Sequence, residues 1–235
     1  DLPEDGPREV HRAAKAFNEM QRRLRGLIND RTQMLAAISH DLRTPITRLR
    51  LRAEFVEDSE QRGKMLNDLE QMEAMIAATL EFSRDDSANE PRKILDLAIL
   101  VQSVCDDAAD VGGDVVYTGI ERASYSGRQL ALWRAFANLI DNAVKYGGRA
   151  RVALETTPER FVITIEDDGP GIPECKVEHV FEPFYRLESS RSRETGGTGL
   201  GLAVVRSIIR GHDGDVTLAN RAEGGLRATV TLPRT

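Results

Sequence analysis

The sequence lacks long apolar runs, clusters of basic residues and any set of closely spaced cysteines. No apolar stretch approaches the roughly 18 residues of a membrane-spanning helix, and the first residues lack the charged-then-apolar pattern of a secretion signal. The only cysteines, Cys105 and Cys175, are far apart, which is typical of unpaired thiols in a reducing compartment rather than of a disulfide framework. A net charge of -6 without a basic run argues against nucleic acid as a partner.

The first part of the chain has helical periodicity. Residues 8–57 carry apolar side chains at three- and four-residue steps, in two interleaved series with a spacing of seven: Val10, Phe17, Leu24 and Ala13, Met20, Leu27, Met34. After a predicted polar turn at 58–63, a second helix places Met65, Leu69, Met72, Ile76 and Leu80 on one face. The pattern predicts an antiparallel hairpin, and two copies would cover both apolar stripes in a four-helix bundle.

A second unit is predicted after residues 85–91, which are polar and end in proline. The patterns predict helices over 95–109 and 129–146, and strands over 149–155, 160–166, 216–219 and 226–232. Helices mixed with strands linked as hairpins indicate an α+β sandwich with helices on one face of the sheet.

Residues 39–45 are Ser-His-Asp-Leu-Arg-Thr-Pro. A lone helical histidine is more often solvated or structural than reactive. The neutral imidazole of His40 is nevertheless a competent nucleophile toward phosphorus through one ring nitrogen, and Asp41 is placed to accept the N–H of the other ring nitrogen. Thr44 lies one turn further on the same face. Pro45 removes a helical hydrogen bond, so we expect a bend beside the histidine.

Residues 138–146 are Asn-Leu-Ile-Asp-Asn-Ala-Val-Lys-Tyr. The amide oxygens of Asn138 and Asn142 suit a hard cation such as the Mg²⁺ that accompanies triphosphates, and Lys145 would add a phosphate contact. The alternative is a polar outer face of a helix.

Two glycine-rich segments follow. Residues 167–172 (Asp-Asp-Gly-Pro-Gly-Ile) end a predicted strand, and residues 196–202 (Gly-Gly-Thr-Gly-Leu-Gly-Leu) lead into an apolar helix. Such glycines permit close backbone approach to a ligand, and the N–H groups at a helix start favour anions. The spacing fits neither the Walker pattern nor the dinucleotide fingerprint, so the motifs predict another kind of ATP site.

These segments, together with 181–186 (Phe-Glu-Pro-Phe-Tyr-Arg), stand in the order of the sequence boxes of the sensor histidine kinases. The chain resembles that family over roughly residues 36–202. Residues 8–27 also resemble the last helix of a HAMP signal-relay module, and residues 30–48 look most like EnvZ-type osmosensor kinases. The resemblance implies a helical hairpin forming a dimeric four-helix bundle, followed by a Bergerat (GHKL-type) α/β sandwich that binds ATP, in the α+β class.

By this resemblance His40 is the phosphoacceptor, Asp41 its general base and Thr44 the residue that orients water in the reverse, phosphatase reaction. Asn142 would hold Mg²⁺ with support from Asn138. The implied reactions are autophosphorylation of His40 by ATP, transfer to an aspartate of an OmpR-like response regulator, and dephosphorylation of that regulator.

The resemblance also implies an ATP site. Asp167 would accept a hydrogen bond from the adenine amino group, while Lys145 and Tyr146 would contact phosphate and adenine. Residues 186–197 match the lid over ATP, with Arg186, Arg191 and Arg193, and Asp168 stands where many members carry Asn. The full predicted ATP-contacting set is Asn138, Asn142, Lys145, Tyr146, Asp167, Gly169, Gly171, Ile172, Arg186, Gly197, Thr198, Gly199, Leu200, Gly201 and Leu202.

The predicted domains are the end of a HAMP module (1–29), the dimerisation and phosphotransfer domain (30–86), a linker (87–91) and the ATP-binding domain (92–235). The predicted partners are a second copy and a response-regulator receiver domain. We expect a cytoplasmic fragment whose whole protein has an upstream sensor and a membrane span in the bacterial inner membrane.

Two alternatives remain. Another ATPase of the same fold, such as a chaperone or topoisomerase relative, would have no reactive histidine outside its ATP domain. A degenerate scaffold that only docks partners would have lost Asn142, Asp167 or the glycine box, and all are present.

Overall fold

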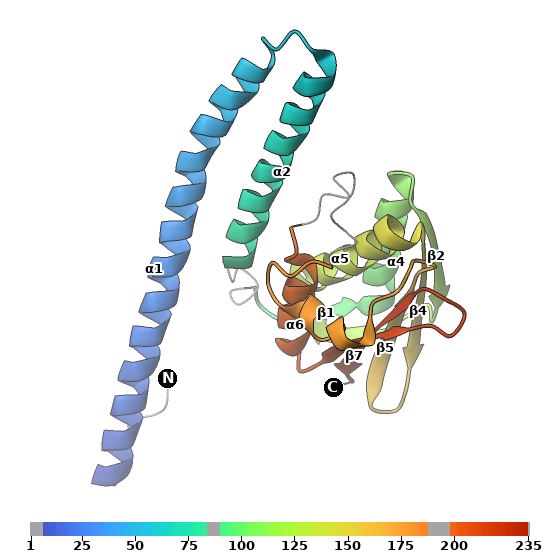
Figure 1. Ribbon diagram of the computed structural model, residues 1–235. Helices are drawn as coiled ribbons and strands as arrows, with labels where there is room; N and C mark the ends of the chain where they lie inside the picture. Colours follow the sequence, from blue (N-terminus) through green and yellow to red (C-terminus); the bar gives the residue numbers. More distant parts are fainter. Residues whose placement is uncertain (1–6, 84–89, 188–197, 235) are drawn as a thin grey trace. The chain divides into compact units, whose positions relative to one another are not determined.

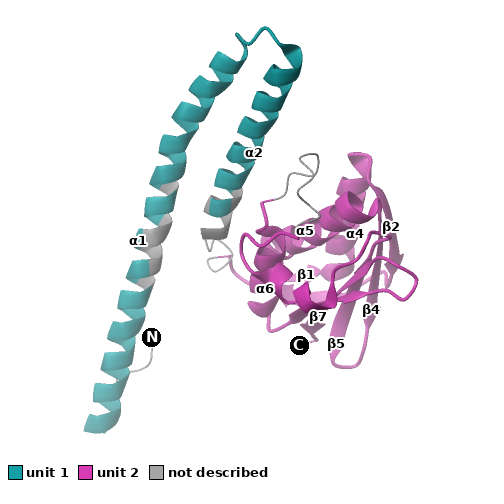
Figure 2. Ribbon diagram, viewed as in Figure 1, with its two compact units in different colours: residues 1–84 teal, residues 85–235 magenta. Residues whose placement is uncertain are grey.

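The computed structural model describes residues 7–83, 90–187 and 198–234. The chain forms two compact units, Asp1–Arg84 and Asp85–Thr235 (Figure 2). The predicted linker, 87–91, falls mostly outside the described residues. Within the described parts, no helix combines the length and the apolar character needed to cross a membrane.

The first unit is an antiparallel hairpin of α1 (Arg8–Ala53) and α2 (Ser59–Ser83) (Figure 1). Ile46 and Ala53 of α1 and Leu69 of α2 are buried. Arg50 and Glu73 form an ion pair at 3.0 Å between the two helices. The helix α1 is continuous through Pro45.

The predicted turn between the two helices is displaced. It was expected at 58–63, but α1 ends at Ala53 and α2 begins at Ser59. The Asp58 carboxylate accepts the N–H groups of Glu60 at 2.9 Å and Gln61 at 3.2 Å. Because this side chain caps α2, the residues after it are already helical, and Gly63 lies inside the helix.

The apolar series on both helices remain largely uncovered in a single chain. Members of these series are between 40% and 68% exposed: Val10, Phe17, Met20, Leu24, Leu27, Met34, Met65 and Met72. An exposed apolar surface of this extent is typical of an interaction site.

The second unit contains a five-stranded sheet in the order β2-β4-β5-β7-β6. The strands β2 and β4 are parallel, and the other neighbours are antiparallel. A separate pair joins β1 to β3. The bounds are β1 Lys93–Asp96, β2 Asp114–Gly119, β3 Ser124–Gly127, β4 Arg149–Thr156, β5 Arg160–Glu166, β6 Asp215–Asn220 and β7 Leu226–Pro233.

Three helices cover one face of this sheet: α4 (Leu97–Asp110), α5 (Gln129–Gly147) and α6 (Gly201–Arg210), with short turns η1 (Glu174–Lys176) and η2 (His179–Phe181) before α6 (Figure 1). Phe161, Ile163 and Ile165 alternate along β5 and are buried against the helices, as a one-faced sheet requires. This arrangement confirms the predicted α+β sandwich. Cys105 is buried and Cys175 exposed, and both thiols are free.

Candidate functional site

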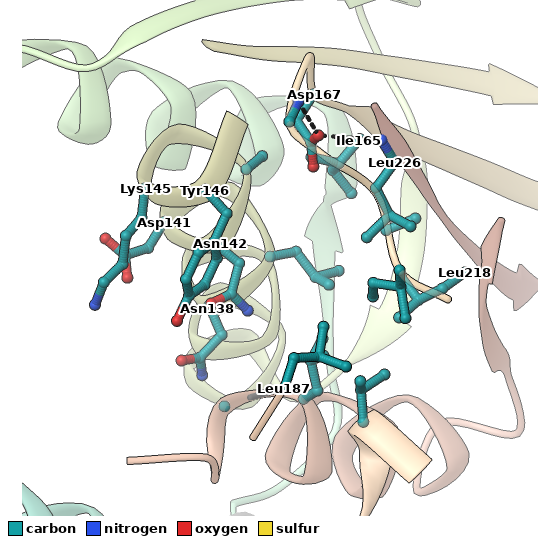
Figure 3. A pocket seen from close by; sticks show the side chains of 18 of the residues that line it. Asn138, Asp141, Asn142, Lys145, Tyr146, Ile165, Asp167, Leu187, Leu218 and Leu226 are labelled. Carbon is teal, nitrogen blue, oxygen red and sulfur yellow. Dashed lines mark hydrogen bonds between the residues drawn. The ribbon is translucent and has the colours of Figure 1, made fainter. Parts of the chain in front are cut away.

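A cavity of about 550 Å³ lies beside α5 in the second unit (Figure 3). Its lining includes most of the predicted ATP-contacting residues: Asn138, Asn142, Lys145, Tyr146, Asp167, Gly169, Gly171, Ile172, Arg186, Thr198, Gly199, Gly201 and Leu202. Leu200 does not line it, because its side chain is buried with 2% exposure. Gly197, Arg191 and Arg193 lie outside the described residues.

Asp167 is the buried acidic group of this cavity, with 7% exposure. Its Oδ1 atom accepts the N–H groups of Gly169 at 2.8 Å and Leu226 at 3.0 Å. Within the described parts of the chain, its Oδ2 atom has no hydrogen-bond partner. Because two donors fix one carboxylate oxygen, the other is left to accept a hydrogen bond from a ligand.

Glycines bring the backbone close to this carboxylate. A Cβ on Gly147, the last residue of α5, would clash with the Asp167 side chain, and one on Gly169 would come 2.7 Å from the Tyr146 carbonyl. Gly171 has φ +72° and packs against the Asn220 amide, where a Cβ would meet the oxygen at 2.5 Å. These positions therefore tolerate only glycine at the base of the cavity.

The helix α5 supplies the amides predicted for metal binding. The Asn138 amide nitrogen donates to the Arg134 carbonyl at 3.0 Å, which leaves the amide oxygen available. A Cβ on Gly201 would lie 3.2 Å from that oxygen and 3.9 Å from the Asn142 amide nitrogen. Both amides thus face the start of α6. Figure 3 shows Lys145 and Asp141 extending to the outer side of α5, away from Leu218 and Leu226.

The start of α6 is an uncapped helix terminus. Among the residues that the structure describes, no side chain caps it, and Leu200 occupies the N-cap position. Phe184, with φ +65°, donates its N–H to the Gly199 carbonyl at 2.9 Å and so ties the 181–187 segment to this terminus. Free N–H groups in the first turn of a helix form a site for anions.

His40 lies in the other unit, on the surface of α1. Its neighbour Ser39 is buried. Successive side chains of a helix point about 100° apart, so His40 points in a different direction from Ser39. The His40 side chain is therefore 80% exposed. Its Nδ1 atom lies 3.4 Å from Asp41 Oδ1, and Thr44 is exposed one turn later. The geometry brings the three predicted residues to one open surface.

Several lining residues carry no recognisable sequence signal. The apolar wall opposite α5 comes from Ile165, Leu218, Leu226 and Ala228, which the strand pattern marks only as core. Asn220 accepts the Ile172 N–H at 2.8 Å and donates to the Ile172 carbonyl at 2.7 Å, across 48 positions of sequence. Because these two residues are far apart in the sequence, no local motif predicts their contact.

Two protein-family models match the chain. Residues 30–88 match the His Kinase A (phospho-acceptor) domain. Residues 127–235 match the histidine kinase-, DNA gyrase B-, and HSP90-like ATPase family. The first match contains His40, and the second contains the whole cavity.

The relatives that match nearly the whole of this chain include two sensor histidine kinases. The chain is 45% identical to the sensor histidine kinase GtrS of Pseudomonas aeruginosa over 99% of its length and 48% of that protein's. It is 32% identical to the sensor histidine kinase CpxA of Escherichia coli over 98% of its length and 53% of that protein's. The chain thus spans about half the length of these relatives.

Among solved structures, the histidine kinase domain of the Escherichia coli osmosensor EnvZ matches with a TM-score of 0.50 and 33% identity. The match covers 62% of this chain and 90% of that one.

Proposed function

The chain belongs to the sensor histidine kinases, and from this premise we propose that it catalyses three phosphoryl-transfer reactions. It phosphorylates its own His40 from ATP, transfers that phosphoryl group to an aspartate of an OmpR-like receiver domain, and dephosphorylates that regulator. The observation that carries the ATP site is that Asp167 Oδ2 has no hydrogen-bond partner among the described residues and belongs to a cavity with apolar walls.

The base of ATP is assigned to the Asp167 end of the cavity. The apolar wall of Leu218, Leu226 and Ala228 suits the faces of a purine ring, and the Asp167 Oδ2 atom suits an exocyclic amino group. Gly169 and Gly171 also line the cavity, and a Cβ at either would clash with the protein, so the backbone itself forms this part of the wall. Tyr146, which is 41% exposed at the end of α5, is placed beside the ring.

The triphosphate is assigned to the opposite end, between α5 and α6. The uncapped N–H groups of α6 would bind phosphate oxygens, with Thr198, Lys145 and Arg186 at the edge. Mg²⁺ fits here because the amide oxygens of Asn138 and Asn142 are hard ligands, and Gly201 leaves room beside them. The ion would neutralise charge on the transferring phosphoryl group.

His40 is the proposed acceptor. Asp41 lies nearest to Nδ1, so Nε2 is the ring nitrogen that faces solvent and is free to attack the γ-phosphorus. The new bond joins Nε2 to phosphorus, ADP leaves, and Asp41 accepts the Nδ1 proton in a hydrogen bond that stabilises the charged ring. Exposure of the ring gives both ATP and a receiver domain access to it.

The active species is proposed to be a homodimer, whose partner covers the apolar series of α1 and α2. A whole protein about twice as long as this chain would add the HAMP start, the membrane span and the sensor. Another ATPase of this fold is less well supported, since the phospho-acceptor family matches outside the ATP unit. A docking scaffold is disfavoured by the intact cavity.

The test is the chemistry of the phosphorylated product. We expect the fragment with ATP and Mg²⁺ to incorporate phosphate that is lost in acid and kept in alkali, because a phosphoramidate behaves in this way and a phosphoester does not. His40→Gln abolishes it. His11→Gln, on the same helix, is the control and keeps it. Label retained in His40→Gln would contradict the assignment.

A further inference from the structure

An arginine that does not line the cavity holds the Asp167 backbone. Arg221 directly follows β6, and its side chain is only 12% exposed. Its Nη1 atom donates to the Asp167 carbonyl oxygen at 2.7 Å and to Asp168 Oδ1 at 2.9 Å. The Asp167 N–H donates to the Leu226 carbonyl at 3.0 Å. Both polar groups of this one backbone residue are therefore bound by the β6–β7 hairpin.

Residues on either side of Asp167 anchor that arginine. Side chains alternate along an extended strand, so Glu166 and Asp168 turn away from the cavity that Asp167 faces. Arg221 Nε lies 3.3 Å from Glu166 Oε2. Asp168 also accepts from Arg151 of β4 at 2.8 Å. The guanidinium groups of Arg151 and Arg221 hold the pKa of the Asp168 carboxyl well below its usual range, so it is charged at neutral pH.

The carboxylate at position 168 matters for this arrangement. Asp168 Oδ2 accepts from Arg151 Nη1, and Oδ1 accepts from both Arg151 Nη2 and Arg221 Nη1, so both oxygens are used. An asparagine at this position has a single acceptor oxygen and no charge, so it would lose the bond from Arg151 Nη1 and would hold both arginines less firmly. Asp168 thus links the loop after β5 to Arg151 of β4 and to Arg221.

We propose that Arg221 is a positioning residue for recognition of the nucleotide base. Held by Asp168 and Glu166, it fixes the Asp167 peptide so that the Oδ2 atom faces the exocyclic amino group of a purine. The inference rests on the proposed ATP site and adds a determinant of base selectivity to it. A Cβ on Gly225 would clash with the Asp167 carbonyl, so the β6–β7 hairpin packs closely against the same backbone group that Arg221 binds.

The test compares two nucleotides that differ only in the amino group. Dissociation constants of the full chain are measured for ATP and for purine riboside 5′-triphosphate, which lacks that group. The wild type prefers ATP. In Arg221→Met, which keeps the bulk of the side chain and removes its donors, the preference falls about tenfold, the worth of one hydrogen bond to a charged group. Binding of the analogue changes less than about twofold, because that nucleotide never used the Asp167 oxygen.

Arg227→Met is the matched control. Arg227 Nε bonds the same Glu166 carboxylate at 2.6 Å but has no contact with Asp167 or Asp168 among the described residues. We expect this variant to keep the wild-type preference. Arg221→Lys, which restores a charged donor, should regain part of the preference for ATP that Arg221→Met loses. Asp168→Asn is the second variant, and it should lose part of the preference even if Arg221→Met does not fold.

The outcomes separate the two proposals. Equal weakening of both nucleotides in Arg221→Met and Asp168→Asn would mean a structural role only and would overturn the positioning role. An unchanged preference in both variants would overturn it as well. If the wild type itself does not discriminate between the two nucleotides, the assignment of Asp167 to the base is wrong, and the inference falls with it.

Discussion

The Nε2 atom of His212 accepts a hydrogen bond from the backbone N–H of Arg128 at 3.0 Å, one residue before α5 begins. On the other side of the ring, Nδ1 donates to the Ile208 carbonyl of α6 at 2.8 Å. The side chain is fully buried. The neutral ring thus joins the two helices that border the cavity, and a second proton on the ring would break one of these bonds.

This contact predicts loss of stability in mild acid. Burial lowers the pKa of His212, so the unfolded chain takes up the proton before the folded one as the pH falls. The stability that the neutral ring contributes is complete above the ordinary histidine pKa of about 6.5 and declines below it. We expect the midpoint of urea unfolding to fall between about pH 7 and pH 5. Fluorescence of Trp133, the only tryptophan, reports on this unit.

The matched variant is His212→Gln, which keeps one donor and one acceptor but does not titrate. It should be less stable at pH 7 and should show a flatter dependence on pH. His11→Gln, in the helical unit, should leave the Trp133 transition unchanged. A wild-type slope preserved in His212→Gln would assign the acid sensitivity to other groups.

The sequence predicts those parts of the fold whose residues interact locally. The helix expected at 129–146 is observed at Gln129–Gly147, and the strand expected at 160–166 is found at those residues. In both cases the spacing of the apolar residues along the element is enough to identify its buried face. Glycine-rich motifs likewise indicate a ligand site because their backbone requirements are local.

Elements that depend on distant partners were missed. The helix expected at 95–109 begins at Leu97, because Lys93–Asp96 pairs with Ser124–Gly127 instead. The Asp96 carboxylate accepts N–H groups from Ala98 at 3.1 Å and from Ala123 at 3.0 Å, so it ends the strand and caps the helix. Ile94 is 84% exposed, so no alternation marks this strand. The contact of Arg221 with Asp168 spans 53 positions and has no local pattern either.

Asp167 and Asn142 should respond differently to Mg²⁺, since one is proposed to bind the base and the other the metal. We expect Asp167→Asn to weaken ATP binding about tenfold with Mg²⁺ or with EDTA, because it loses a charged acceptor. Asn142→Ala should cost most when Mg²⁺ is present. Isothermal titration under both conditions measures this. Equal losses for Asn142→Ala in Mg²⁺ and EDTA would contradict a metal role.

The exposed apolar series predict a dimer. Sedimentation equilibrium of the chain at micromolar concentration should give twice the 26.1 kDa chain mass. Leu27→Glu places a charge in the seven-residue series and should shift the equilibrium toward monomer. Phe55→Glu is the control, since Phe55 is 86% exposed and lies in the loop that joins α1 to α2. A folded wild-type monomer would remove the four-helix bundle from this account.

Thr44 is predicted to position water for dephosphorylation of the regulator. A receiver domain that brings its aspartate to His40 for transfer also brings its aspartyl phosphate near the next turn of that face, where Thr44 is exposed. An acyl phosphate is already activated, so water needs placement more than a strong base, and one hydrogen bond should change the rate about tenfold. Thr44→Ala should keep autophosphorylation and prolong the life of the phosphorylated regulator. Thr44→Ser, which keeps the hydroxyl, should retain part of the activity. Dephosphorylation at the wild-type rate in Thr44→Ala, with transfer from His40 intact, would assign any phosphatase activity to another residue.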